Sequence, residues 1–483
     1  MKKMIVFLTL FLSFLNFVHA QTPNPIWAVT YGTSSDFNQS LCCAVDQSGG
    51  LYVVGYTQYY PHGNYLIIKY NTTTGNIIWQ KTFDGNPGDP DNNNDIAMGC
   101  TVDNSGNLYV TGMSSGTLTN NDILTIKYNT TNGDTIWTRK YNGSSNGPDA
   151  GTACALDGSG NLYIGGLSQN AANTDFCLLK YNATNGNLIW ARNYPSPLGN
   201  KGEAYGCSVS GSSVFLNGYI YTGTNYNLFT VKCNTSNGDT VWTRINHEGL
   251  DSLMFIHSDC IADNSGNVFT TGNCSNGTSG IYCRTIKYDA TGIILWSKIF
   301  ERPLNNPLND FSGGLALDPM GNLLVTGSTR ETGAYTGGSL LLIRYNSATG
   351  DTIWAKEYPA GRQGIGCVTD ASGFIYVTGR PDFWGWLTIK YDNTGMLVVT
   401  DYHPEMDDFL VYPDPVSTTL NIQLPPFAET VEIYTMQGIK CIEEKPVTSP
   451  YTIDVETLPS GIYLVAVSGK SGRIAWKKFI KLI

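Results

Sequence analysis

A stretch of about 54 residues recurs seven times along this chain, and this repetition constrains the fold more than any other feature. One copy runs through "GCTVDNSGN" (99–107), "LYVTG" (108–112), "ILTIKYN" (123–129) and "DTIWTRKY" (134–141). The glycine that ends the second segment recurs as Gly55, Gly112, Gly166, Gly218, Gly272, Gly327 and Gly379. The basic residue of the third segment recurs as Lys69, Lys127, Lys180, Lys232, Lys287, Arg344 and Lys390. Such a chain builds its core by stacking copies of one unit.

Each segment of the repeat is short, rich in Val, Ile, Thr and Tyr, and bounded by Gly, Asn and Asp. This pattern is typical of strands joined by tight turns. Four strands per copy at this period favour a β-propeller in which each copy is one blade. The sequence therefore predicts an all-β protein whose main domain is a seven-bladed β-propeller.

The tryptophans indicate how the ring closes. Six copies carry a tryptophan in the fourth segment, at Trp79, Trp137, Trp190, Trp242, Trp296 and Trp354. The seventh copy has Val398 or Val399 there, whereas Trp27 lies in an extra segment, "IWAVTYG" (26–32), before the first copy. Because a closed ring leaves no open strand edges, we expect Ile26 to Tyr31 to form the outer strand of the seventh blade. The alternative is an unrelated N-terminal strand.

The repeat resembles two kinds of known propeller sequence. Its "D-x-S-G-N-L-Y-V-T-G" run, followed by the tryptophan-bearing segment, resembles SBBP-type repeats and, more loosely, NHL repeats over about residues 26–400. The segment "YNTTNGDTIW" (128–137) also looks like the docking repeat of pyrroloquinoline-quinone dehydrogenases. That resemblance implies a structural role, since in those enzymes other residues hold the cofactor. One motif present in every blade does not mark a single site, so we interpret it as part of the scaffold.

The N-terminus and the charge narrow the class of protein. Lys2, Lys3 and the apolar run from Met4 to Val18 predict a signal peptide over residues 1–20, cut after Ala20. Residue 21 is glutamine, so no lipid anchor is expected there, and no later run is long and apolar enough to span a membrane. A net charge of -10 argues against a nucleic-acid partner. We expect an exported, monomeric protein with a propeller over residues 21–404.

Twelve cysteines in an exported chain would ordinarily indicate disulfides. Six of them occupy one position of the first strand, at Cys43, Cys100, Cys154, Cys207, Cys260 and Cys367, with Leu315 in the remaining copy. Equivalent positions of neighbouring blades are expected to lie too far apart to be bridged, so we interpret these as buried free thiols. A soft metal ion bound by the six thiols is the less favoured alternative. Cys274 and Cys283 flank one loop and are the candidate disulfide.

Signals of catalysis are weak in this sequence. His62, His247, His257 and His403 follow the signal peptide, and none belongs to a helix-borne metal-binding pair. The run "DPDNNND" (89–95) places Asp89, Asp91, Asn93 and Asp95 at alternate positions, as calcium loops do. It lacks the usual glycine and the final glutamate, so a solvated loop is the competing interpretation. Calcium is the one cofactor that the sequence suggests.

The loops differ between the two faces of the expected ring. Links between strands one and two, and between three and four, are short and uniform, whereas the others vary in length and content. Binding residues usually gather on such variable loops. In the first and seventh copies, which closure makes neighbours, these loops carry Tyr59, Tyr60, His62, Arg380, Asp382 and Trp384. Aromatic rings beside polar groups suit a sugar or a protein ligand, although some of these aromatics, Trp386 above all, are alternatively core residues.

The period stops after Pro404, and the remaining residues 405–483 carry a different set of motifs. "FLVYPDPV" (409–416), "VEIYTMQG" (431–438), "LPSGIYLV" (458–465) and "KKFIKLI" (477–483) occur in order. Together they resemble the type A C-terminal sorting domain of the type IX secretion system, although Asp414 stands where asparagine is usual. This resemblance implies a small Ig-like β-sandwich, recognised by the secretion machinery, that takes the propeller across the outer membrane. Short alternating strands fit a sandwich independently.

These features favour a secreted or cell-surface propeller that binds a polysaccharide or a protein without catalysis. The alternative is a secreted enzyme, either a quinone-dependent dehydrogenase or a glycan lyase or hydrolase. No convincing nucleophile or acid-base group supports that alternative. A purely architectural surface protein is the third hypothesis.

Overall fold

The computed structural model consists entirely of strands and connecting turns in the residues that it describes. These are residues 23–32, 38–57, 62–85, 93–115, 120–197, 199–250, 257–275, 281–300, 308–331, 338–381, 385–392, 409–424, 428–435, 440–446, 449–468 and 474–482. Contacts divide the chain into two compact units, Pro23–Asn393 and a second unit that contains Thr394–Ile483. The described residues contain no helix of the length and apolarity that crossing a membrane requires.

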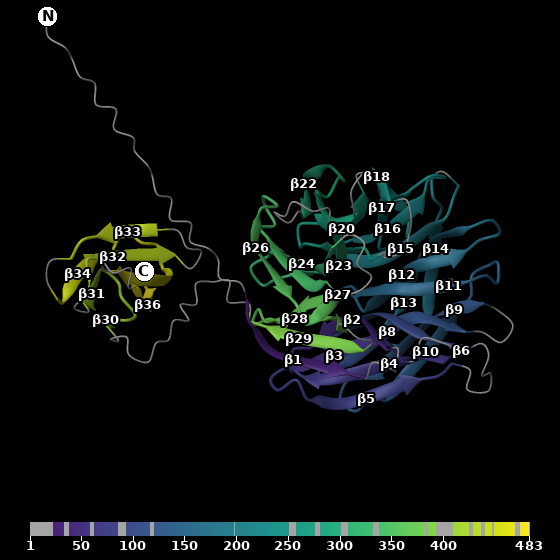
Figure 1. Ribbon diagram of the computed structural model, residues 1–483, viewed down its shortest axis with the longest axis horizontal. Helices are drawn as coiled ribbons and strands as arrows, with labels where there is room; N and C mark the ends of the chain where they lie inside the picture. The colour runs from purple at the N-terminus through teal and green to yellow at the C-terminus, as the bar shows by residue number, and fades with distance from the viewer. Residues whose placement is uncertain are drawn as a thin grey trace, which may run out of the picture. The chain divides into compact units, whose positions relative to one another are not determined.

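Within the described part of Pro23–Asn393, the strands form seven antiparallel sheets arranged around a common centre (Figure 1). The innermost strands are β2 (Gln39–Val45), β7 (Ile96–Val102), β11 (Asp149–Leu156), β15 (Gly202–Ser210), β19 (Asp259–Ala262), β23 (Leu308–Leu317) and β27 (Gly361–Thr369). The second strands are β3 (Gly50–Thr57), β8 (Asn107–Ser115), β12 (Asn161–Gln169), β16 (Ser213–Tyr221), β20 (Val268–Ser275), β24 (Leu323–Glu331) and β28 (Ile375–Pro381). Each innermost strand contacts the innermost strand of the next sheet, and β27 contacts β2. The sheets therefore make a closed ring.

The outer half of each sheet follows the same order. The third strands are β4 (His62–Asn71), β9 (Asn121–Asn129), β13 (Thr174–Asn182), β17 (Tyr226–Asn234), β21 (Ile281–Tyr288), β25 (Ser339–Tyr345) and β29 (Trp386–Tyr391). The outermost strands are β5 (Ile77–Phe83), β10 (Thr135–Tyr141), β14 (Leu188–Tyr194), β18 (Thr240–Leu250), β22 (Ile294–Phe300), β26 (Thr352–Tyr358) and β1 (Pro25–Tyr31). A short strand, β6 (Asn93–Asn94), pairs in parallel with β4.

The ring closes through the N-terminal strand. β1 pairs antiparallel with β29, with Trp27 opposite Lys390 and Tyr31 opposite Trp386. The sheet that contains β27, β28 and β29 thus receives its fourth strand from the start of the chain (Figure 1). The two ends of the propeller sequence therefore share one sheet. Without β1, this sheet would have three strands and β29 would be an open edge.

The "D-x-S-G-N" segments form the turns between the first and second strands. The carboxylate of Asp103 accepts hydrogen bonds from the backbone N–H groups of Ser105 and Asn107, at 2.9 Å each. Gly106 follows at a φ of +80°, which glycine adopts without strain. The phenol of Tyr109 donates to the same Asp103 carboxylate at 3.0 Å. The repeated aspartate and glycine are therefore turn-forming residues.

The repeated tryptophan and lysine join neighbouring sheets through a shared acceptor or, for Lys180 and Trp190, through the successive carbonyls of Thr235 and Ser236. The indole N–H of Trp79 and the ammonium group of Lys69 both donate to the carbonyl of Thr130 in the next sheet, at 3.1 and 2.9 Å. We call this pair of hydrogen bonds the Trp–Lys contact. At the closure of the ring, Trp27 and Lys390 donate in the same way to the carbonyl of Thr72. The recurring motif thus connects sheets around the ring.

One sheet departs from this pattern, at the position where arginine replaces lysine. Arg344 is 2 % exposed, and its guanidinium forms an ion pair with the buried carboxylate of Asp318. The indole N–H of Trp354, in the same sheet, has no hydrogen-bond partner among the described residues. The described part of the junction after this sheet therefore lacks the Trp–Lys contact.

The described strands of the C-terminal unit form two sheets around a separate core. One sheet has the order β30 (Leu410–Tyr412), β31 (Thr419–Gln423), β34 (Tyr451–Asp454), and the other β33 (Lys440–Glu444), β32 (Thr430–Thr435), β35 (Gly461–Ser468), β36 (Ile474–Lys481). Buried side chains of both sheets, including Leu420, Ile453, Val465 and Phe479, pack together. The predicted class, a β-propeller followed by a C-terminal β domain, is confirmed.

Candidate functional site

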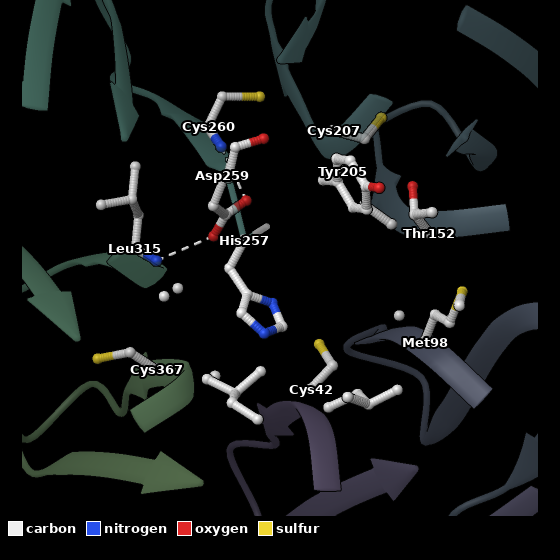
Figure 2. A pocket seen from close by; sticks show the side chains of 18 of the residues that line it. Cys42, Met98, Thr152, Tyr205, Cys207, His257, Asp259, Cys260, Leu315 and Cys367 are labelled. Carbon is white, nitrogen blue, oxygen red and sulfur yellow. Dashed lines mark hydrogen bonds between the residues drawn. The ribbon is translucent and has the colours of Figure 1, made fainter. Parts of the chain in front are cut away.

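A cavity of about 480 Å³ lies at the centre of the ring (Figure 2). All seven innermost strands, or the residues next to them, contribute to its lining. A cavity of this size suits a small molecule rather than a polymer. It is the candidate site that the described residues define best.

A bulge in the innermost strands decides which side chains enter this cavity. The pairing between first and second strands shifts by one residue at Leu41, Met98, Thr152, Tyr205 and Ile365. Each of these unpaired residues lines the cavity. A bulge turns a side chain out of its regular alternation, so the cavity receives aliphatic, thioether, hydroxyl and phenol groups from five sheets.

The recurrent cysteines lie beside these bulges and are free thiols. Burial raises the pKa of Cys43, Cys100, Cys154, Cys207, Cys260 and Cys367, which keeps these thiols protonated. The Cys154 thiol points to the carbonyl of Tyr109 at 3.9 Å, and the Cys260 thiol to that of Phe215 at 3.5 Å. Among the described residues, no three His, Cys, Asp or Glu side chains converge to hold a metal ion. These recurrent cysteines are therefore free thiols in this structure, as the sequence indicated.

Among the described residues, Asp259 is the one carboxylate that lines the cavity. Its oxygens accept hydrogen bonds from the backbone N–H groups of Cys260 at 2.8 Å and Leu315 at 2.9 Å. Burial raises the pKa of Asp259 to about 7, against the effect of these two donors. Asp259 is thus poised between its neutral and charged forms near neutral pH.

His257 projects its imidazole into the same cavity (Figure 2). Burial lowers its pKa to about 4, so the ring is neutral at physiological pH. Its backbone carbonyl accepts a hydrogen bond from the Ser312 hydroxyl at 2.8 Å, which ties this segment to the next sheet. A neutral imidazole and a carboxyl of raised pKa give the cavity acid-base groups that the sequence analysis did not identify.

A sequence signal for Asp259 existed. The residue before the recurrent cysteine is Gly99, Ala153, Gly206, Gly314 or Gly366 in five repeats, and only Cys42 and Asp259 carry a functional group there. No comparable signal marks His257, because it precedes β19 at a position where the other repeats vary.

The loop site expected from the first and seventh repeats falls largely outside the described residues. Tyr59, Tyr60, Asp382 and Trp384 belong to segments that the structure does not describe, and His62 is described only by its backbone at the start of β4. Arg380 lies on β28, half-buried and opposite Gln363 of β27. The two sheets are neighbours, since β2 contacts β28. The meeting of these loops stays a prediction.

Trp386, the aromatic residue for which a core position was the alternative, is fully buried on β29. Its ring contacts that of Tyr31, with centroids 6.0 Å apart, where β1 closes the ring. It therefore belongs to the core of the last sheet.

Only the C-terminal end of the predicted calcium loop, residues 89–95, lies within the described residues. Asp89 and Asp91 lie outside the described residues, and Asn93 is described by its backbone alone, in β6. The buried Asp95 carboxylate accepts the backbone N–H of Gly85, and burial raises its pKa. Asp149 makes the same contact with Gly143 one repeat later. Asp95 thus has a repeated structural role, and calcium binding stays a prediction.

The predicted disulfide between Cys274 and Cys283 is wrong for this structure, in which both are free, buried thiols. Cys274 pairs with Tyr282, whereas Cys283 pairs with Asn273. Successive residues of a strand point to opposite faces of the sheet, so this register directs the two thiols away from each other. The sequence showed that the cysteines flank one loop but not the register of the hairpin.

Comparison with known proteins gives two family matches. The profile of a secretion system C-terminal sorting domain matches residues 410–482, which confirms the resemblance seen in the C-terminal motifs. The profile of the family described as outer membrane protein assembly factor BamB matches residues 17–273, more than half of the 483 residues. The resemblance to SBBP repeats in particular stays a prediction.

Similar solved structures include a quinohemoprotein alcohol dehydrogenase from Comamonas testosteroni, with 11% identity, a TM-score of 0.43, and coverage of 83% of this chain and 81% of that one. A europium-containing methanol dehydrogenase is 12% identical, with a TM-score of 0.42 and coverage of 94% and 86%. No curated protein matches this chain in sequence.

Proposed function

Because this chain belongs to the family described as outer membrane protein assembly factor BamB, and carries a secretion sorting domain, we propose that it is an exported, non-catalytic binding protein. Export itself follows from the sorting domain, which indicates recognition by the type IX secretion system and a final location at the cell surface or in the medium. The binding role is the part that goes beyond these matches.

The observation that carries the proposal is the use of the repeated motif. In the Trp–Lys contact, each indole N–H and ammonium group donates to a backbone carbonyl of the next sheet, as at Lys127, Trp137 and Ala183. The indole has a single N–H, so a tryptophan bound to the scaffold in this way has no donor left for a ligand. This supports a rigid ring that presents its variable loops.

The ligand class follows from charge and family. A net charge of -10 disfavours polyanions such as nucleic acids. The family description refers to a factor that assembles outer membrane proteins, so a protein ligand is the first to test and a neutral polysaccharide the second. Both would use the loops that carry Tyr59, Tyr60, Asp382 and Trp384.

The test is saturable binding of the purified mature chain to panels of outer membrane proteins and surface polysaccharides. We expect binding to one panel, and a loss of about tenfold or more in Trp384→Ala, since a central aromatic contact often dominates an interface. Tyr412→Ala is the matched control, because Tyr412 is an exposed aromatic residue of the sorting domain.

Two results would contradict the proposal. Absence of saturable binding to either panel leaves the architectural alternative. Stoichiometric uptake of pyrroloquinoline quinone, seen as a new absorbance band together with dye reduction in the presence of an alcohol, would establish the enzyme alternative.

A further inference from the structure

Cys42 occupies a register at which neighbouring innermost strands approach each other very closely. Five repeats have glycine or alanine at this position. A Cβ on Gly206 would lie 2.5 Å from the backbone nitrogen of Cys260, and one on Gly366 would lie 3.2 Å from the Cα of Cys42 itself. A side chain at this register therefore points directly at the innermost strand of the next sheet. In the first sheet that side chain is a thiol.

The strand that Cys42 points at carries a second thiol, Cys100. The Cys42 thiol points to the carbonyl oxygen of Cys100 at 3.9 Å. The recurrent cysteines point back toward the preceding sheet, as the contact of Cys154 with the carbonyl of Tyr109 shows. Cys42 points forward and Cys100 points back, so both thiols lie in the same interface, between the first and second sheets.

We propose that Cys42 and Cys100 form a disulfide that ties the first sheet to the second once the exported chain meets a disulfide oxidant. In the first step the Cys42 thiolate attacks one sulfur of the oxidant, forms a mixed disulfide and releases one thiol. In the second step the Cys100 thiolate attacks the Cys42 sulfur and releases the second thiol. Each cysteine proton ends on a released thiol, the oxidant gains two electrons, and the protein loses them.

The reactivity of the two thiols indicates which one attacks the oxidant and which one resolves the mixed disulfide. Cys42 is only half-buried, so a reagent in the cavity reaches it, and its pKa is lowered first of all by the hydrogen bond from Cys100. Burial and the neighbouring Cys42 raise the pKa of Cys100. Thiolate character makes a cysteine the attacking group. Cys42 is therefore the attacking thiol, and Cys100 resolves the mixed disulfide.

Geometry excludes the nearest competing pair, Cys42 with Cys43. These residues pair in regular register with Val54 and Val53 of β3, so their side chains point to opposite faces of the sheet. The compartment favours the reaction, because disulfides form and persist outside the cytoplasm.

The experiment uses the full mature chain carrying Cys441→Ser, since Cys441 is exposed and would react on its own. The reduced protein is treated with oxidised glutathione, blocked with iodoacetamide, digested and analysed by mass spectrometry. We expect a linked peptide pair containing Cys42 and Cys100, which disappears after reduction with dithiothreitol. Absence of this pair, or a pair that links Cys42 to Cys43, overturns the proposal.

Three variants in the same background separate the roles. Cys100→Ser should stop at a glutathione adduct on Cys42, and Cys42→Ser should show neither the link nor an adduct on Cys100. Cys154→Ser is the matched control, because Cys154 is the other half-buried thiol of the cavity, and it should form the link as the parent does. A Cys100→Ser variant that shows no adduct although folded by circular dichroism would contradict the assigned order of attack. The result does not depend on ligand binding, so it stands apart from the proposed function.

Discussion

Asp259 and Cys42 are the two functional side chains at a register that the other repeats fill with glycine or alanine. A side chain there meets the next innermost strand, so each residue occupies a position where a small residue would pack more simply. For Asp259 the structure gives a reason, since its carboxylate caps the backbone N–H of Leu315. The pairing of β23 with β24 skips Gly313 and Gly314 just before Leu315, so the sheet is irregular at this point. Asp259 thus supplies a hydrogen-bond acceptor at the point where the next sheet is irregular.

The raised pKa of Asp259 predicts a dependence of stability on pH. The ordinary value is 3.8 and the folded value is about 7, so between these values the folded protein holds a proton that the unfolded chain has lost. The free energy of unfolding therefore falls as pH rises from about 4 to about 7, by at most about 4 kcal/mol from this group. Asp259→Asn removes the titration and should show a weaker decline.

Melting temperatures of the parent and Asp259→Asn, measured from about pH 4 to about pH 8, test this. The amide keeps only one oxygen for two N–H donors, so the variant should be the less stable protein at the acidic end. The difference should narrow or reverse toward pH 8. Taking the difference cancels other buried carboxyls of raised pKa, such as Asp95 and Asp149. Parallel curves would show that Asp259 does not titrate in this range.

At the scale of the element, the Trp–Lys contact predicts unequal effects of the same substitution. Trp137→Phe keeps a buried aromatic ring but removes the donor to the Ala183 carbonyl, which should cost about 1 kcal/mol. Trp354→Phe should cost less, because the Trp354 indole N–H has no partner among the described residues. Urea unfolding of both variants measures the two costs. Equal costs would mean that packing of the ring, and not the hydrogen bond, sets the contribution of these tryptophans.

The strands of the propeller could be predicted from the sequence alone, whereas the bulges in them could not. The period, the alternation and the single displaced tryptophan were enough to predict strands in a propeller, because each depends on local residues repeated many times. The bulges at Met98 and Tyr205 were not predictable in this way. A shift of one residue reverses which side chain faces the cavity, and it is set by the close approach of innermost strands across the ring. The cavity, His257 and the facing of Cys42 toward Cys100 all depend on that approach.

At the scale of the whole molecule, contacts are concentrated within Pro23–Asn393 and within the unit that holds the sorting domain. Each unit has its own buried core, with Leu420 and Phe479 in the C-terminal one and Val54 and Ile126 in one part of the propeller. A unit that has its own core can unfold as a separate transition. This arrangement suits an exported protein in which one unit is recognised by the secretion machinery and the other carries the function.

Closure of the ring gives the prediction that belongs to this scale. Deletion of Pro25–Tyr31 removes β1, leaves β29 as an open edge and removes the Trp27 contact with the Thr72 carbonyl. We expect the propeller transition in calorimetry to broaden and to lose at least about 3 kcal/mol of stability, because Trp27, Val29 and Tyr31 of this strand pack against buried apolar residues. Deletion of residues 405–483 is the control and should leave that transition in place, since the propeller core does not include them. A propeller that melts unchanged without β1 would mean that the contacts of β2 with β27 and β28 hold the ring closed without it.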